Sequence, residues 1–480
     1  MAMLSRPLLR LKGQELVPPD EDRRVDLDIF DVLLPCRFYE VNYKVASLGQ
    51  VSPTLEFLLR LVKAAPGIAD DDAATFFGYS PSEIAYVLEE AIGPGYLERR
   101  AGRLWLTISG EGLFKDDDKQ PSIYTVESRR RSFGFDLMAI APQVKRFLDE
   151  LERVLPELPS EDPAGTGRVA ERVPARFKQF FRELADQADR GKTERRDIYS
   201  IDPVVTPGER YQMPIRVVTF AQASNPTAAE IDLSSWRMDH EIADRPEIER
   251  AVALFVKDQQ TSVNQLDAAN GYQTLIDLAP EFLKEFTTRN GLSEGRYWRE
   301  AVSRAGEPRV DRKTIPIVGS LLLPGNIERI QAVFDYGLRN MTEAPTNIYA
   351  VAPQTRRWGA TTQQRDLLTL IQEKTARSFP GPDKPEMKSI CLYAWDKPAQ
   401  YTAKTFDEIQ PIRVADFPRS LELFLVPGVM AAAVVHAPLG SSTGNPVPLG
   451  LTSFDPLVID RAYAYFLERH EPYRVKDGSA

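Results

Sequence analysis

The second half of the chain alternates between two kinds of segment, and this alternation limits its possible folds more than any other feature. From about residue 196, short apolar runs of strand type are separated by stretches with helical periodicity. Such alternation is typical of an α/β domain with a largely buried sheet. Strands are predicted over residues 197–201, 215–220, 315–323, 347–352, 389–394, 421–427, 429–436 and 447–452, and helices over residues 246–257, 272–286, 327–339, 363–377 and 456–469.

A short helical unit comes earlier in the chain. Apolar residues at helical spacing predict a first helix over residues 55–62, and a second helix fits residues 70–77. The sequence Ser80-Pro81-Ser82-Glu83 is typical of a capped helix start, with proline in the first turn and glutamate at the third position. After this third helix, Ala101-Gly102 separates two short apolar-basic runs and predicts a hairpin.

This order of three helices and a hairpin, followed by Leu106-Thr107-Ile108-Ser109-Gly110, resembles the winged-helix family over about 60 residues. The resemblance implies a third helix that enters the DNA major groove and a wing that contacts phosphates. Here the third helix carries Glu83, Glu89 and Glu90 and no basic residue on its solvent face. Two uses therefore remain open, namely DNA contact through arginines and docking of a protein or a second copy. The candidate DNA-binding residues are Arg99, Arg100, Arg103, Arg129, Arg130 and Arg131.

Between the two regions, residues 136–195 are predicted to form a helical connector. Amphipathic periodicity covers residues 143–155 and 168–190, and a linker-like stretch separates them at residues 159–167. A pair of such helices could pack against itself or against a second copy, which makes a homodimer one expected assembly. Solvated surface helices fit the same pattern.

The elements after residue 315 resemble one half of a phospholipase-D-like domain. The family's signature histidine falls on His436 and its glycine on Gly450. The lysine position of the signature holds Pro438, and the acidic position holds Thr443. The resemblance therefore implies the fold without the residues that phosphoryl transfer uses.

The charge around His436 supports the same conclusion. Attack on a phosphodiester needs a nucleophile and cations that stabilise the developing negative charge. No lysine or arginine lies within seven residues of His436 in the sequence, so Arg356, Arg357 or Lys397 would have to supply that charge through the fold. We expect no catalytic residue, and His436 is the candidate only if the chain is an enzyme.

Composition limits the partners and cofactors that we expect. Sixty Lys and Arg residues face 69 Asp and Glu residues, so the surface as a whole repels phosphate. Two cysteines and three histidines provide few metal ligands, and we expect no metal site and no cofactor; the cluster Asp239-His240-Glu241 is interpreted as a charged surface. The absence of a signal-like or membrane-spanning apolar run favours a cytoplasmic protein without membrane contact.

The expected fold class is α/β, or α+β overall. The expected segments are an N-terminal extension of irregular or extended chain (1–50), a winged-helix domain (51–135), the helical connector (136–195), an α/β subdomain (196–310) and a phospholipase-D-like α/β half-domain (311–475). We expect a non-catalytic, DNA-associated adaptor or accessory subunit of a bacterial antiviral defence or DNA-processing complex. Its protein partner would be an ATPase or helicase subunit, because the chain has no P-loop motif. The alternatives are a ligand-sensing transcription regulator and a divergent phosphodiesterase or nuclease that uses His436.

Overall fold

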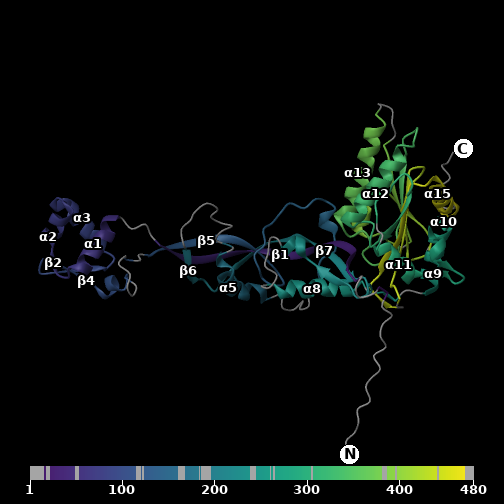
Figure 1. The fold of residues 1–480 in the computed structure, drawn as a ribbon. Helices are drawn as coiled ribbons and strands as arrows, with labels where there is room; N and C mark the ends of the chain where they lie inside the picture. Colours follow the sequence, from purple (N-terminus) through teal and green to yellow (C-terminus); the bar gives the residue numbers. More distant parts are fainter. Residues whose placement is uncertain are drawn as a thin grey trace, which may run out of the picture.

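One long strand, β1 (Arg24–Leu48), runs through the middle of the molecule and joins its parts (Figure 1). It lies in a five-stranded central sheet, where β5 (Tyr124–Asp136), β6 (Arg196–Ile201) and β7 (Thr206–Gln222) all pair with it in antiparallel register. Strand β8 (Glu230–Asp232) extends the sheet beyond β7. The predicted strands at 197–201 and 215–220 are confirmed, whereas the regular strand β1 was not foreseen within residues 1–50.

The computed structural model has an α+β fold, in which helices and several sheets share one chain. It describes residues 16–17, 22–48, 53–114, 121, 124–159, 168–182, 184, 196–237, 245–259, 261–262, 265–303, 306–380, 386–394, 397–413, 415–440 and 443–470.

Residues 53–114 form a small unit, which we call the tip domain, at one end of the molecule in Figure 1. Its helices and strands agree with the predicted helices and hairpin. They are α1 (Pro53–Ala64), β2 (Ile68–Ala69), α2 (Asp70–Phe77), α3 (Pro81–Ile92), β3 (Leu97–Arg100), β4 (Arg103–Leu106) and α4 (Ile108–Glu111).

Local sequence explains these element boundaries. Gly78 ends α2 in the left-handed region at φ 71°, which costs a glycine little. Ser80 begins α3 with a capping box, in which its backbone N–H donates to the Glu83 carboxylate at 2.8 Å and its hydroxyl accepts from the Glu83 N–H. Leu58, Leu59 and Leu104 are fully buried in the shared core.

The tip domain is inserted between two strands of the central sheet. The chain enters it after β1 and returns through β5, and the last residue pair of these strands is Leu48 opposite Tyr124. In Figure 1 the two strands extend toward the tip domain as an antiparallel ribbon.

The predicted helix over residues 143–155 is wrong, because this segment holds only a 3-10 turn at Glu152–Val154. Its backbone polar groups are used by tertiary contacts instead. The Gln143 N–H donates to Gly134 O at 2.9 Å, and the Tyr211 hydroxyl donates to Gln143 O at 2.6 Å. The Leu33 N–H then donates to Pro156 O at 2.8 Å, which fastens the end of the segment to β1.

The second predicted connector helix exists in part. It is α5 (Val169–Gln179), whose Val173 and Phe177 are fully buried in the core beneath the central sheet. The predicted continuation to residue 190 lies largely outside the described residues. The described connector therefore packs onto the central sheet of its own chain.

The C-terminal domain is built on a mixed seven-stranded sheet with the strand order β12-β19-β17-β16-β13-β14-β15. Helices cover both of its faces, as Figure 1 shows, and the predicted elements of this region are present. The prediction for 315–323 was too long, because β12 ends at Val318 and a turn leads into the next helix. The strands are β12 (Thr314–Val318), β13 (Asn347–Val351), β14 (Lys388–Tyr393), β15 (Glu408–Pro411), β16 (Leu421–Val426), β17 (Met430–Ala437) and β19 (Val447–Ser453).

Two apolar cores lie on the two faces of this sheet. Helices α12 (Pro324–Leu338) and α13 (Thr362–Ser378) pack on one face. Helices α9 (Gln265–Leu278), α11 (Glu294–Ser303) and α15 (Pro456–His470) pack on the other.

Residues 196–310 contribute to both large parts of the molecule. Strands β6, β7 and β8 lie in the central sheet, and α8 (Pro246–Lys257) packs against that sheet's core. Helices α9 and α11, together with the short α10 (Pro280–Leu283), belong to the C-terminal core.

A buried carboxylate connects the central sheet to the C-terminal domain. Asp31 of β1 accepts two hydrogen bonds from Arg216 of β7, at 2.8 and 3.0 Å. It also accepts from the Thr361 hydroxyl and the Thr362 N–H, each at 2.8 Å, at the start of α13. Burial favours the neutral acid, but these donors hold the pKa of Asp31 below its usual value.

Candidate functional site

His436, the candidate histidine of the sequence analysis, lies on strand β17 in the middle of the C-terminal domain. Its Nε2 is 2.6 Å from Oε2 of Glu422 on the neighbouring strand β16. Both residues are only 3% exposed. Such a buried ion pair or hydrogen bond is costly to break, because either partner alone would be left unpaired away from water.

A second carboxylate reaches the same place from strand β1. Asp28 is partly buried, and desolvation raises its pKa to about 6. The positive charge of a protonated His436 and the hydrogen bonds from Ile29 and Ser320 oppose this rise, whereas the Glu422 charge adds to it. Two carboxylates therefore lie near one imidazole, at the junction of β1 with the C-terminal sheet.

The cavity beside this cluster is too small for a phosphodiester substrate. Its volume is about 20 Å³, which is room for about one water molecule. Asp28, His436, Gln259 and Asn445 line it. We infer that the cluster, as it stands, has no space for phosphoryl transfer.

Arg356, Arg357 and Lys397, the cations that the sequence suggested for His436, do not change this conclusion. Arg356 lines the small cavity, but it pairs with Asp258 at 2.5 Å, and its side chain is 60% exposed. Arg357 also pairs with Asp258, at 3.1 Å, and stacks over the Phe255 ring. Lys397 does not line the cavity.

Gly450, the other residue of the phospholipase-D resemblance, has a packing role. It lies opposite Val434 in the pairing of β19 with β17, whereas His436 lies opposite Pro448. A Cβ atom at Gly450 would be 1.9 Å from the Ala433 carbonyl oxygen. Close approach of two strands therefore requires glycine here, whatever the chemistry of the domain.

The wing arginines are present on the predicted hairpin of the tip domain, and each has a partner within that domain. Arg99 pairs with Asp70, and Arg100 pairs with Glu98. Arg103 donates to the Gly67 carbonyl at 2.8 Å. Arg100 and Glu98 are 70% and 37% exposed, so their ion pair is cheap to rearrange, whereas the Asp70 side chain that Arg99 contacts is only 11% exposed.

The other three predicted arginines lie on a different element, strand β5. Arg129 pairs with Glu127 at 2.8 Å, and Arg130 pairs with Glu40 of β1 at 2.5 Å. Arg131 lies opposite Val41 and has an interaction partner as well. The six arginines therefore belong to two separate elements, the wing and the ribbon.

A groove lies between α2, α3 and the start of the wing, with a volume of about 830 Å³; we call it the acidic groove. Ile84, Leu88 and Ile92 of α3 form an apolar side. Asp70, Asp71, Thr75, Tyr79, Glu89 and Arg99 are among its polar lining residues. The groove thus combines an apolar surface with a negative rim.

The charge of the whole tip domain has the same sign as this rim. Between residues 53 and 114 the chain has nine acidic and five basic residues, a formal charge of −4. Phe76 and Tyr86, on α2 and α3, are 68% and 66% exposed. Exposed aromatic residues on a negatively charged surface are more typical of protein contacts than of DNA contacts.

The sequence analysis missed Asp28, Glu422 and the acidic groove. Glu422 had a detectable signal, since it is the one charged residue in the apolar strand Leu421–Val426. Asp28 lies far from both partners in the sequence and has no such signal. The groove depends on the packing of α2 against α3, which periodicity alone does not give.

Comparison with other proteins adds no further assignment: no protein-family model, no curated protein and no solved structure matches this chain. Among the described residues, no group of three or more His, Cys, Asp and Glu side chains is placed to hold a metal ion, the Asp28 cluster included. Asp239-His240-Glu241 lies outside the described residues. Within the described part of the chain, no helix is both long and apolar enough to span a membrane.

Proposed function

We propose that this chain is a non-catalytic adaptor that docks a basic protein segment in the acidic groove of its tip domain. The observation that carries the proposal is the groove itself, which is lined by Ile84, Leu88 and Ile92 and by two exposed acids, Asp71 and Glu89. An amphipathic helix with a basic face fits such a surface, because its apolar residues are buried while its charges meet carboxylates.

Two further observations support an adaptor rather than an enzyme. The cavity beside His436 holds about 20 Å³, which leaves no room for a substrate. The tip domain is carried at the end of an antiparallel ribbon, away from the C-terminal domain (Figure 1). A partner bound at the tip would therefore be held at a distance from whatever binds the rest of the chain.

DNA contact through the wing is the second candidate. The exposed pair of Arg100 with Glu98 favours it, since a surface ion pair releases its arginine at little cost. The net charge of −4 on the tip domain opposes it, because phosphate binding depends on local positive potential. We therefore place protein docking first, with an ATPase or helicase subunit as the proposed kind of partner.

The test uses a photo-crosslinking amino acid at position 85, which lines the groove on α3. In the native cell it should crosslink to one defined protein. The Glu89→Arg substitution should lower that product about tenfold, because it opposes a basic partner and obstructs the groove. Glu111→Arg, an equal charge change on exposed α4, should leave it unchanged.

Purified protein separates the two candidates. We expect binding of a labelled DNA duplex to be weaker than about 10⁻⁴ M at physiological salt, the weak end of non-specific binding. Tight, salt-dependent binding that is lost when Arg99, Arg100 and Arg103 are changed to alanine would contradict protein docking and establish the wing as a DNA contact.

A further inference from the structure

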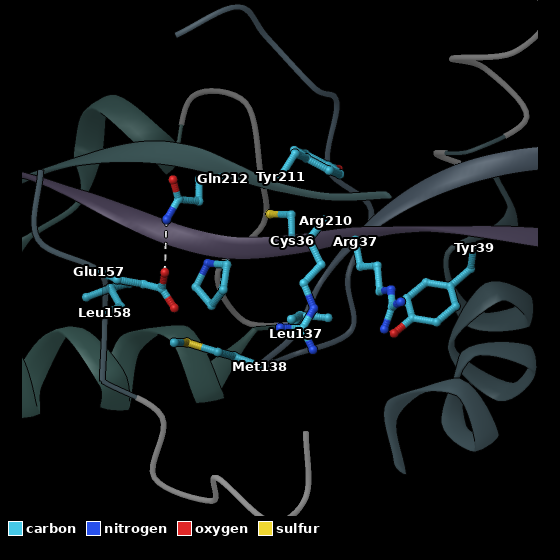
Figure 2. A pocket seen from close by; sticks show the side chains of 11 residues that line it. Cys36, Arg37, Tyr39, Leu137, Met138, Glu157, Leu158, Arg210, Tyr211 and Gln212 are labelled. Atoms are coloured by element: carbon cyan, nitrogen blue, oxygen red, sulfur yellow. Dashed lines mark hydrogen bonds between the residues drawn. The ribbon is translucent and has the colours of Figure 1, made fainter. Parts of the chain in front are cut away.

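Another pocket, separate from the acidic groove and from the cavity beside His436, lies on the central sheet (Figure 2). We call it the arginine pocket. Its volume of about 440 Å³ is within the range of small-molecule sites. It lies where β1 pairs with β7, and the segments around Leu137–Met138 and Glu157–Leu158 complete its wall.

Two arginines lie directly opposite each other in this pocket. Arg37 of β1 pairs with Arg210 of β7 in the antiparallel register. Figure 2 shows both side chains leaving the same side of the ribbon, with the Arg37 guanidinium beside the Tyr39 ring. Like charges at directly opposed positions destabilise a sheet, and a bound anion would offset this repulsion.

No acidic side chain among the described residues neutralises the two arginines. The Arg37 Nε donates to the Gly208 carbonyl at 3.0 Å, which fixes the guanidinium while its two terminal nitrogens remain available. The nearest acids along β7 and the wall are used elsewhere: Glu209 pairs with Lys145, and Glu157 accepts from Gln212 at 2.9 Å. The pocket therefore holds two arginines against one carboxylate, Glu157, and neither arginine forms an ion pair with a described acid.

The Tyr39 hydroxyl lies within electrostatic range of both arginines. Burial raises the pKa of the Tyr39 hydroxyl, and the charges of Arg37 and Arg210 both act against that rise. Both guanidiniums are thus within electrostatic range of one hydroxyl, which can donate a further hydrogen bond. Together they provide donors for an anion with several oxygens; phosphate fits this better than a carboxylate, which has only two oxygens.

The remainder of the pocket suits the body of a larger ligand. Leu137, Met138 and Leu158 provide apolar wall, and the Glu157 carboxylate lies beyond them beside Gln212 (Figure 2). A carboxylate accepts hydrogen bonds from N–H groups. We propose that the arginine pocket binds a small phosphate monoester whose other end carries N–H donors, the chemistry of a mononucleotide.

Calorimetric titration of the full chain with GMP, guanosine and inorganic phosphate tests this proposal. GMP should bind, and its affinity should exceed that of guanosine and of phosphate, because only GMP uses both ends of the pocket. Arg37→Gln and Arg210→Gln should each weaken GMP binding about tenfold or more, the effect of removing one charged hydrogen-bond donor. Arg172→Gln, the same charge change at an exposed position on α5, should leave it unchanged.

Two further measurements distinguish a lost contact from a misfolded variant. Glu157→Gln should weaken GMP and leave inorganic phosphate unaffected. Without ligand, Arg210→Gln should melt no lower than the wild type, because it removes the opposed like charge. The proposal is overturned if GMP at millimolar concentration neither releases heat nor raises the melting temperature, if phosphate binds as tightly as GMP, or if Arg172→Gln weakens binding as much as Arg210→Gln.

Discussion

Two sets of ion pairs, one on the hairpin of the tip domain and one inside the C-terminal domain, differ in how far they are exposed to solvent. In the tip domain, the pairs of Arg99 with Asp70 and of Arg100 with Glu98 have arginine side chains that are more than half exposed. In the C-terminal domain, Glu422 and His436 are only 3% exposed. Exposed pairs exchange partners at little cost, whereas buried pairs form part of the fold. By this criterion the Glu422–His436 pair is part of the C-terminal fold, whereas the Arg100–Glu98 pair can change partners at the surface of the tip domain.

The largest effect should follow from removing one partner of the buried pair. Glu422→Ala leaves His436 without its 2.6 Å partner, which should destabilise the C-terminal domain by about 3–5 kcal/mol. Hydrogen exchange of the β16 and β17 amides measures this loss. Glu89→Ala, an exposed acid in the tip domain, should change stability by less than about 0.5 kcal/mol. Equal effects of the two variants would remove the distinction between the domains.

The next effect depends on pH. Asp28 has a folded-state pKa of about 6, above the ordinary aspartate value, so the folded state favours its protonated form. Its contribution to stability is full below pH of about 4 and is lost as pH rises through about 6. Asp28→Asn should therefore be more stable than the wild type at pH 8, by up to about 3 kcal/mol, with the difference vanishing near pH 4.

Urea unfolding at several pH values measures this difference. Asp26→Asn on the same strand provides the control, because its side chain is 49% exposed. A constant offset between Asp28→Asn and the wild type at all pH values would contradict an ionisable, partly buried Asp28.

The smallest effect should come from the wing. Arg100→Ala removes an exposed partner of Glu98 and should cost the tip domain no more than about 1 kcal/mol. Hydrogen exchange of the β3 and β4 amides measures this change. A loss of several kcal/mol would mean that this pair, despite the exposure of Arg100, belongs to the fold as the His436 pair does.

Sequence patterns predicted local structure well where interactions between residues close in the sequence determine it. The capping box of Ser80 and Glu83 placed α3, and periodicity placed α8 at Pro246–Lys257. The helix expected over residues 143–155 is absent because the backbone groups of Gln143 bond to Gly134 and Tyr211, and Pro156 just beyond the segment bonds to Leu33, which no local pattern reveals.

The candidate sites were harder to predict for the same reason. The spacing between His436 and Gly450 in the sequence identified His436 as a candidate. Its partners Asp28 and Glu422 come close to it only through tertiary packing. Arg37 and Arg210 belong to strands far apart in the chain, and their opposition depends on the register of β1 with β7. A single sequence indicates which residues can carry charge, and the fold determines which of them meet.

The pairing of β1 with β5 ends at Leu48 opposite Tyr124, and the tip domain lies in the connection between these two residues. To the central sheet, residues 49–123 are one long hairpin connection. The entropy of closing such a connection grows only with the logarithm of its length, about 0.6 kcal/mol for each doubling. The sheet can thus carry the tip domain, another domain or a tight turn at this position, with little change in the free energy of pairing β1 with β5.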